Sequence, residues 1–230
     1  MKYSEFIKLI EKFLLDGKYP KLSVWPDKIE LSGEFSKLNK QVFENTSTTG
    51  NEHEISIFYI DGDILASSIL KGEKNQVKVK HDVNLAYVPQ RTGVFEKQIY
   101  IDGKIVKKYS VKQVPPKQIV KYMINIHSHP KFKDLKGNEN YSFFSVVDME
   151  GFIKSNLLLT GLITDKFWLA CKTDRTVTKV GTVGEEMIYF ITEGAYEGQK
   201  DVEELVLKEM KNWGIVFYSG EIGGTLSRVN

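Results

Sequence analysis

The chain has 230 residues, of which 41% are hydrophobic and 27% are charged, so it can bury a substantial core without disulfides. Its 32 basic and 30 acidic residues give a formal net charge of +2, which argues against a nucleic-acid-binding protein. The single cysteine, Cys171, excludes an intrachain disulfide and a cysteine-rich zinc cluster. We interpret Cys171 as a core strand residue rather than the nucleophile of a thiol protease, because nothing near it would activate a thiolate.

The start of the chain, MKYSEF, lacks the long apolar core of a secretory signal. No apolar stretch approaches the length of a membrane span. We therefore expect a cytoplasmic protein that does not enter a membrane.

Periodicity predicts an amphipathic helix over residues 4–15, ended by Asp16-Gly17. Its apolar face is expected to pack on the domain, although a partner-binding helix is the alternative. Further on, Asp102-Gly103 between two alternating segments predicts a tight β-hairpin over 95–110. The other expected strands are 28–31, 54–60, 63–70, 77–83, 157–164, 166–172, 177–183, 188–191 and 214–218; the other helices are 34–44, 115–122 and 201–213; and residues 219–230 are expected to be mobile. This irregular alternation predicts an α/β protein with a mixed sheet flanked by helices.

Two histidines lie at the end of a short apolar run, residues 123–126, that reads as a buried strand. Residues i and i+2 of a strand share a face, so His127 and His129 can point at one ion while Ser128 faces the other way. Pro130 should end the strand because it cannot donate to a ladder.

A third candidate ligand, Asp148, lies on a different element. Ser145 followed three residues later by this acid is typical of a helix N-terminus, which places Asp148 in the first turn. Two imidazoles and a carboxylate could hold a transition metal and leave a fourth position open, as catalytic zinc sites do. The simpler interpretation is two ordinary histidines and a capping pair.

His127-Ser128-His129-Pro130 and Ser145-Val146-Val147-Asp148 resemble the signature of the JAMM/MPN+ (Mov34/JAB) zinc metalloprotease family, in its prokaryotic-type JAB form. The resemblance implies a cytidine deaminase-like fold over residues 21–218, preceded by the helix within residues 1–20. It implies that His127, His129 and Asp148 bind Zn²⁺, that Ser145 stabilises the tetrahedral intermediate, and that an upstream glutamate is the general base. Deamination itself is rejected, since the chain has no Pro-Cys-x-x-Cys segment.

The resemblance further implies a peptidase or isopeptidase acting on a protein or peptide, such as the C-terminus of a ubiquitin-like protein. The alternatives are a non-catalytic MPN-type scaffold and a JAB protein associated with DNA repair. Such enzymes pair an extended tail with a sheet edge, which the hairpin over 95–110 or the segment 131–144 could provide.

Glu54 is the predicted base, because it begins an alternating strand expected beside the histidine strand, and Glu52 is the alternative on the same face. His53 is expected to be a bystander, and His81, in a charged run, to lie on the surface. Residues 131–144 are longer than the corresponding family interval and read as an exposed loop. This loop is either a flap over the site or a tolerated insertion.

Overall fold

The computed structural model describes residues 1–133, 137–176 and 199–230. The strands predicted over 177–183 and 188–191 lie outside the described residues. Within the described residues, no helix is long and apolar enough to cross a membrane.

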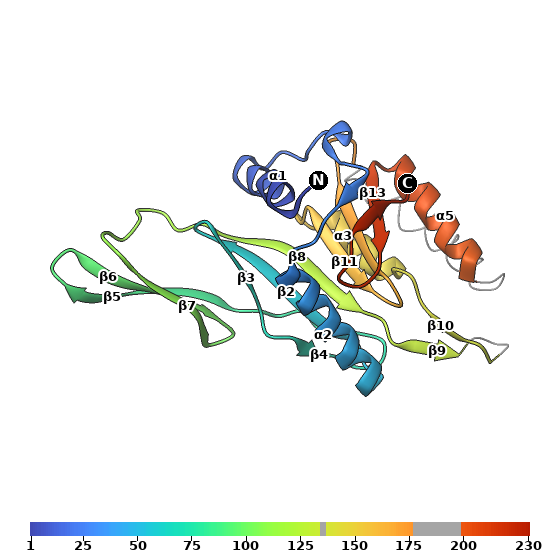
Figure 1. The fold of residues 1–230 in the computed structure, drawn as a ribbon, viewed down its shortest axis with the longest axis horizontal. Helices are drawn as coiled ribbons and strands as arrows, with labels where there is room; N and C mark the ends of the chain where they lie inside the picture. The colour runs from blue at the N-terminus through green and yellow to red at the C-terminus, as the bar shows by residue number, and fades with distance from the viewer. Residues whose placement is uncertain (134–136, 177–198) are drawn as a thin grey trace.

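A nine-stranded mixed sheet forms the centre of the molecule, in the order β1-β14-β13-β12-β11-β8-β2-β3, with β4 also paired to β2 (Figure 1). Strands β8 and β11 are parallel, while every other pair in this sheet is antiparallel. The strands are β1 (Lys28–Ile29), β2 (His53–Ile60), β3 (Asp63–Ala66), β4 (Leu70–Lys71), β8 (Val120–Ser128), β11 (Leu159–Ile163), β12 (Phe167–Lys172), β13 (Ile215–Gly220) and β14 (Leu226–Arg228). The predicted mixed α/β architecture is confirmed.

Helices cover both faces of this sheet. One hydrophobic core joins it to α1 (Tyr3–Asp16) and α2 (Gly33–Thr49), and a second core joins it to α3 (Val146–Lys154) and α5 (Gln199–Asn212). A short 3-10 helix, η1 (Leu22–Val24), follows α1. Phe6 and Ile10 of α1 are buried in the first core, so this helix packs on the domain as predicted.

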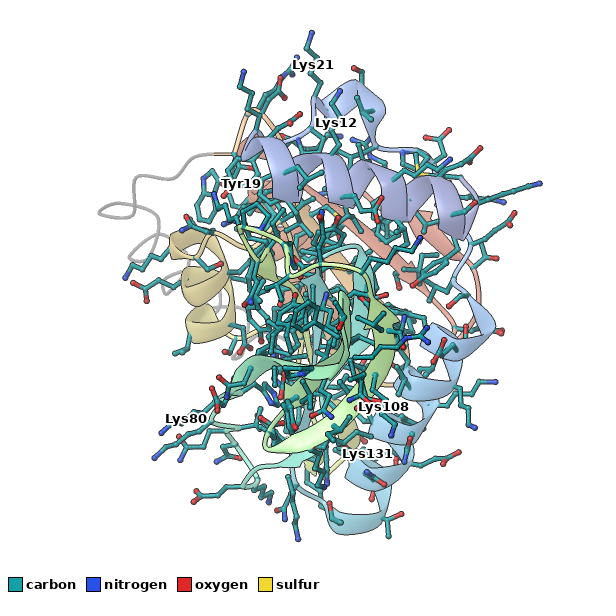
Figure 2. The ribbon with its side chains drawn as sticks, turned by 90° about the vertical axis from the view of Figure 1, so that its left-hand side faces the viewer. Lys12, Tyr19, Lys21, Lys80, Lys108 and Lys131 are labelled. Atoms are coloured by element: carbon teal, nitrogen blue, oxygen red, sulfur yellow. The ribbon has the colours of Figure 1, made fainter. Side chains whose placement is uncertain are left out.

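A separate sheet of β5 (Val83–Arg91), β6 (Val94–Ile101) and β7 (Lys104–Val111) projects from one end of the molecule (Figure 1). Its β6–β7 turn has positive φ at Asp102 (54°) and Gly103 (74°), which is the conformation that an Asp-Gly hairpin requires. The predicted hairpin is therefore confirmed. Ile99 and Ile101 of β6 bury themselves against Phe58 and Ile60 of β2, which fastens the small sheet to the large one. Figure 2 views the molecule from this end.

Two predicted elements are wrong. Residues 77–82 form no strand, and β5 instead begins at Val83. Residues 115–119 form no helix, and β8 begins at Val120. The backbone N–H of Ile119 donates to Asp61 Oδ1 at 2.6 Å, while Asp61 N–H donates to the Ile119 carbonyl at 2.9 Å. Pairing with the turn after β2 thus takes the backbone groups that a helix would have used.

Two segments expected to be irregular are partly ordered into strands. Leu226 is fully buried in β14, which pairs with β13 and β1, so residues 219–230 do not form the expected mobile tail. Within the expected loop 131–144, β9 (Lys131–Lys133) pairs with β10 (Glu139–Tyr141) as a short antiparallel ladder. The partner β1 of β14 lies far away in the sequence, whereas β9 pairs with the nearby β10.

Candidate metal centre

The end of β8 presents the two histidines to one face of the large sheet. His127 and His129 both line the same pocket and are buried. Ser128 points to the opposite face, where its hydroxyl contacts Thr46 and donates to the His53 carbonyl at 3.1 Å. This alternation confirms the orientation predicted for the strand.

Asp148 reaches the histidines from the first turn of α3. Ser145 is the N-cap of that helix, because its Oγ accepts from the Asp148 N–H at 3.2 Å. In return, the Ser145 N–H and hydroxyl each donate to Asp148 Oδ2 at 2.7 Å. Oδ1 lies 3.4 Å from His127 Nε2, and Oδ2 lies 3.5 Å from His129 Nε2. The capping box therefore aims the carboxylate at both imidazoles.

The ligand atoms of His127, His129 and Asp148 all lie within 4.8 Å of one another, close enough to hold one metal ion. His127 Nε2 is buried and makes no hydrogen bond of acceptable geometry with any described residue. His129 Nδ1 lies 3.0 Å from the Ser142 carbonyl, to which it donates, so its Nε2 keeps a free lone pair. A buried nitrogen without a hydrogen bond and an oriented imidazole are what metal ligation requires.

Electrostatic attraction links Asp148 to the two histidines. Burial lowers the pKa of His127, but the nearby carboxylates of Asp148, Glu52 and Glu54 together outweigh burial and raise it. Burial would likewise raise the pKa of Asp148, yet the nearby imidazoles of His127 and His129 bring it far below its usual value. Asp148 is thus ionised, as a carboxylate ligand must be.

Glu52 and Glu54 lie on the same sheet face as the histidines but meet different partners. The Oε1 atom of Glu52 is 3.9 Å from His129 Nε2, and Glu52 lines the pocket. Burial raises the pKa of Glu52, against the lowering effect of His129 and His127. Of the two glutamates, Glu52 is therefore the one that faces the candidate metal site.

Glu54 lies opposite His127 in the β2–β8 ladder, but its carboxylate is hydrogen-bonded to other side chains. Asn125 Nδ2 donates to Glu54 Oε1 at 2.5 Å, the Ser56 hydroxyl also donates to it, and His81 Nε2 lies 3.0 Å from Oε2. Glu54 is fully buried and does not line the pocket. This arrangement satisfies a buried carboxylate and leaves little freedom for proton transfer at the pocket.

The prediction that His81 lies on the surface is wrong, because its side chain is only 2% exposed. Its Nδ1 lies 2.9 Å from Asp102 Oδ2 and its Nε2 faces Glu54, so both ring nitrogens donate to carboxylates. We call the side chains of Glu54, His81 and Asp102 the latch. No local pattern indicates this contact, since Glu54, His81 and Asp102 come from three separate segments. His53 is turned to the opposite face, where its Nδ1 lies 3.2 Å from Thr46 Oγ1, as expected of a bystander.

The latch predicts a pH-dependent stability. Burial lowers the pKa of His81, but the bonds and charges of Glu54 and Asp102 outweigh it and raise the pKa above 6.5. The stabilisation is therefore complete below pH 6.5 and is lost as pH rises through the raised pKa. Chemical denaturation of wild type and His81→Gln between about pH 5 and about pH 9 should show a difference in unfolding free energy that shrinks with rising pH. A difference that grows with pH would contradict the charged latch.

The candidate site opens into a pocket of about 1030 Å³. Its floor carries Glu52, His127, His129, Ser145 and Asp148. Its walls come from residues 74–77 and Val79, from Pro130, Lys131 and Phe132 at β9, and from Val147 and Phe152 of α3. Cys171 is buried in β12, away from these walls, and burial raises its pKa, so it is a core residue as predicted.

The structure thus brings together His127, His129, Asp148 and Ser145, adds Glu52, and holds Glu54 in the latch. Comparisons with models of protein families, with curated proteins and with solved structures find no match to this chain. The pocket and its side chains therefore carry the functional argument.

Proposed function

We propose that this protein is a zinc-dependent metallopeptidase or isopeptidase that hydrolyses an amide bond. The observation that carries the proposal is the buried His127 Nε2, which has no hydrogen bond to a described residue and faces the Asp148 carboxylate. His129 and Glu52, both buried, complete a group of nitrogen and carboxylate donors that line the pocket. This is the residue set of the JAMM/MPN+ signature, and the mixed sheet with helices on both faces is compatible with the cytidine deaminase-like fold of that family.

His127, His129 and Asp148 would hold the ion. Two imidazoles and one carboxylate are a usual donor set for catalytic zinc. Bound zinc supplies Lewis acidity toward the scissile carbonyl and toward water. The protein fixes the donors through the Ser145 cap on Asp148 and the Ser142 carbonyl on His129.

Glu52 is proposed as the general base, in place of Glu54. Its carboxylate borders the ligand cluster, so it can take a proton from the attacking water and pass it to the leaving amine. Burial raises its pKa, which makes it a stronger base than an exposed glutamate. Glu54 is less suited to this role, because three side chains already hold its carboxylate.

Ser145 is proposed to stabilise the developing oxyanion. Its hydroxyl lines the pocket but donates to Asp148 Oδ2 in this structure. To act on substrate, it exchanges that hydrogen bond for one to the oxyanion. Its N-cap role does not depend on this exchange, because the cap uses the lone pair that accepts from the Asp148 N–H.

Ser145→Ala and Ser145→Gly should separate the two roles. Alanine removes the cap and should lower the free energy of unfolding by about 1 kcal/mol, whereas glycine is tolerated at an N-cap at a cost of roughly a few tenths of a kcal/mol. Both variants lack a side-chain donor and should lose turnover by about 10²–10³-fold. Urea denaturation and steady-state kinetics measure the two effects. If Ser145→Gly kept full turnover, the hydroxyl would have no catalytic role.

The substrate is proposed to be a protein or peptide, with the C-terminal tail of a ubiquitin-like protein as the leading candidate. The test is incubation of the protein with fusions of several ubiquitin-like tails to a reporter, with and without a chelator. We expect cleavage by wild type, none with chelator, and none by Asp148→Asn. Cleavage that survives both treatments would overturn the metallopeptidase proposal.

Metal analysis distinguishes the proposed enzyme from a non-catalytic scaffold of the same fold. About one zinc per chain is expected for the enzyme. A purified protein that takes up no zinc would favour the scaffold. DNA binding, the remaining alternative, is disfavoured by the net charge of +2 and would appear as a salt-dependent shift with duplex DNA.

A further inference from the structure

Residues 72–82 run along the mouth of the metal pocket, and we call this segment the strap. At one end, the strap is bonded to the backbone of Glu52. The Glu52 N–H donates to the Glu73 carbonyl and the Gly72 N–H donates to the Glu52 carbonyl, both at 2.8 Å. The strap therefore starts beside the proposed general base.

The other end of the strap is held by the latch. His81 fills the space between Glu54 on β2 and Asp102 at the β6–β7 turn, and its ring lies edge-on to Phe58 with 5.9 Å between centroids. Asp102 Oδ1 also accepts from the Asp82 N–H at 3.2 Å. One buried imidazole thus joins the strap to both the large and the small sheet.

Between these two anchors, the strap contributes Val77 and Val79 to the pocket wall. Val79 is 44% exposed, and the pocket is also lined by Phe132 (39% exposed) and Val147 (76% exposed). These apolar side chains come from three elements and surround one mouth. Exposed apolar groups gathered around a pocket are typical of a binding surface.

The strap is bent tightly at its first residue. A Cβ on Gly72 would lie 2.4 Å from the Gln76 carbonyl oxygen and 2.8 Å from Val77 Cα, both backbone atoms. The Glu73 N–H donates to that same Gln76 carbonyl at 2.8 Å. The path of residues 72–77 therefore depends on glycine at this position.

We propose that the strap is a substrate-binding wall of the metal pocket, that it contacts an apolar side chain next to the scissile bond, and that His81 is the positioning residue that holds it. The reacting groups are those of the proposed peptidase, so the expected effect on substrate rests on that function. The role of His81 in holding the strap does not depend on the peptidase function. His81 touches neither the ligand cluster nor the pocket, and it acts through the placement of Val77 and Val79.

His81→Gln tests the latch, because glutamine cannot donate to both carboxylates in the geometry of an imidazolium. Lys108→Gln is the matched control, since Lys108 is exposed on β7 and borders no part of the pocket (Figure 2). Three quantities are measured in each protein: zinc content, amide hydrogen exchange across residues 72–82, and KM and kcat on a peptide with a leucine beside the cleaved bond. In His81→Gln we expect unchanged zinc content, faster exchange in the strap, and a KM raised about tenfold or more with little change in kcat.

Gly72→Ala disturbs the strap from its other end without touching the latch. It should raise KM for the leucine peptide in the same way, and by less for a peptide with glycine at that position. Strap exchange in His81→Gln no faster than in Lys108→Gln would overturn the latch. Equal effects of Gly72→Ala on both peptides would overturn the binding wall. If wild type cleaves no peptide, the proposed function fails, and hydrogen exchange alone still decides whether His81 holds the strap.

Discussion

Glu52→Gln should leave zinc binding intact and lower kcat by about 10²–10⁴-fold, the usual contribution of a positioned general base. The amide keeps the size of the side chain but cannot accept the proton from water. Glu54→Gln should keep kcat, with any loss confined to KM, because Glu54 holds the latch rather than the reacting groups. Steady-state kinetics on a tail fusion, together with metal analysis of each variant, checks both expectations.

Glu150→Gln is the control for this pair. Glu150 lies on α3 close to Asp148 in sequence, but its carboxylate pairs with Lys154. Its turnover should equal that of wild type. A Glu52→Gln variant with full activity, combined with an inactive Glu54→Gln that still binds zinc, would return the role of base to Glu54.

The directions in which the candidate ligands point follow from local rules that can be read in the sequence. Two histidines separated by one residue share a face of a strand, and a Ser-x-x-Asp pair places an acid in the first turn of a helix. Both rules depend only on residues within a few positions, and the structure places His127, His129 and Asp148 together. The Asp-Gly hairpin was predictable for the same reason.

The residues next to Glu52 and Glu54 in the sequence do not indicate which of the two faces the candidate metal site. Glu54 in β2 and Glu52 just before it point to the same face, and they differ in the side chains that reach them from other elements. His81, far along the chain, takes the Glu54 carboxylate, while β8 brings His129 to Glu52. The prediction for His81 is wrong because the charged residues around it are exposed, whereas its own ring lies between Glu54 of the large sheet and Asp102 of the small sheet.

The mispredicted elements share one cause. A proline-started helix over 115–122 and a strand over 77–83 have suitable local patterns, but long-range pairing overrides them. The backbone of Ile119 is hydrogen-bonded to Asp61, and the backbone of Asp82 is hydrogen-bonded to Asp102. The C-terminal segment is polar, yet Leu226 fills the core while β14 lies between β1 and β13. Such pairings become visible only when the sheet order is known.

Asp148→Asn should abolish both turnover and zinc-dependent stabilisation. An ion that binds only the folded protein stabilises it by about 2.7 kcal/mol when its free concentration is a hundredfold above Kd. We therefore expect zinc to raise the unfolding free energy of the chelator-treated wild type by this order, and to have little effect on the variant. Asparagine is a much weaker zinc ligand than aspartate, since it has no negative charge to neutralise the ion.

Urea denaturation with chelator and with added zinc measures this difference, and Glu150→Gln is again the control. It should respond to zinc as wild type does, because its carboxylate is engaged by Lys154. The comparison cancels non-specific effects of zinc on the unfolded chain, which affect all three proteins alike. If Asp148→Asn were stabilised as much as wild type, the ion would be held by other residues. The carboxylate that caps α3 would then serve the helix alone.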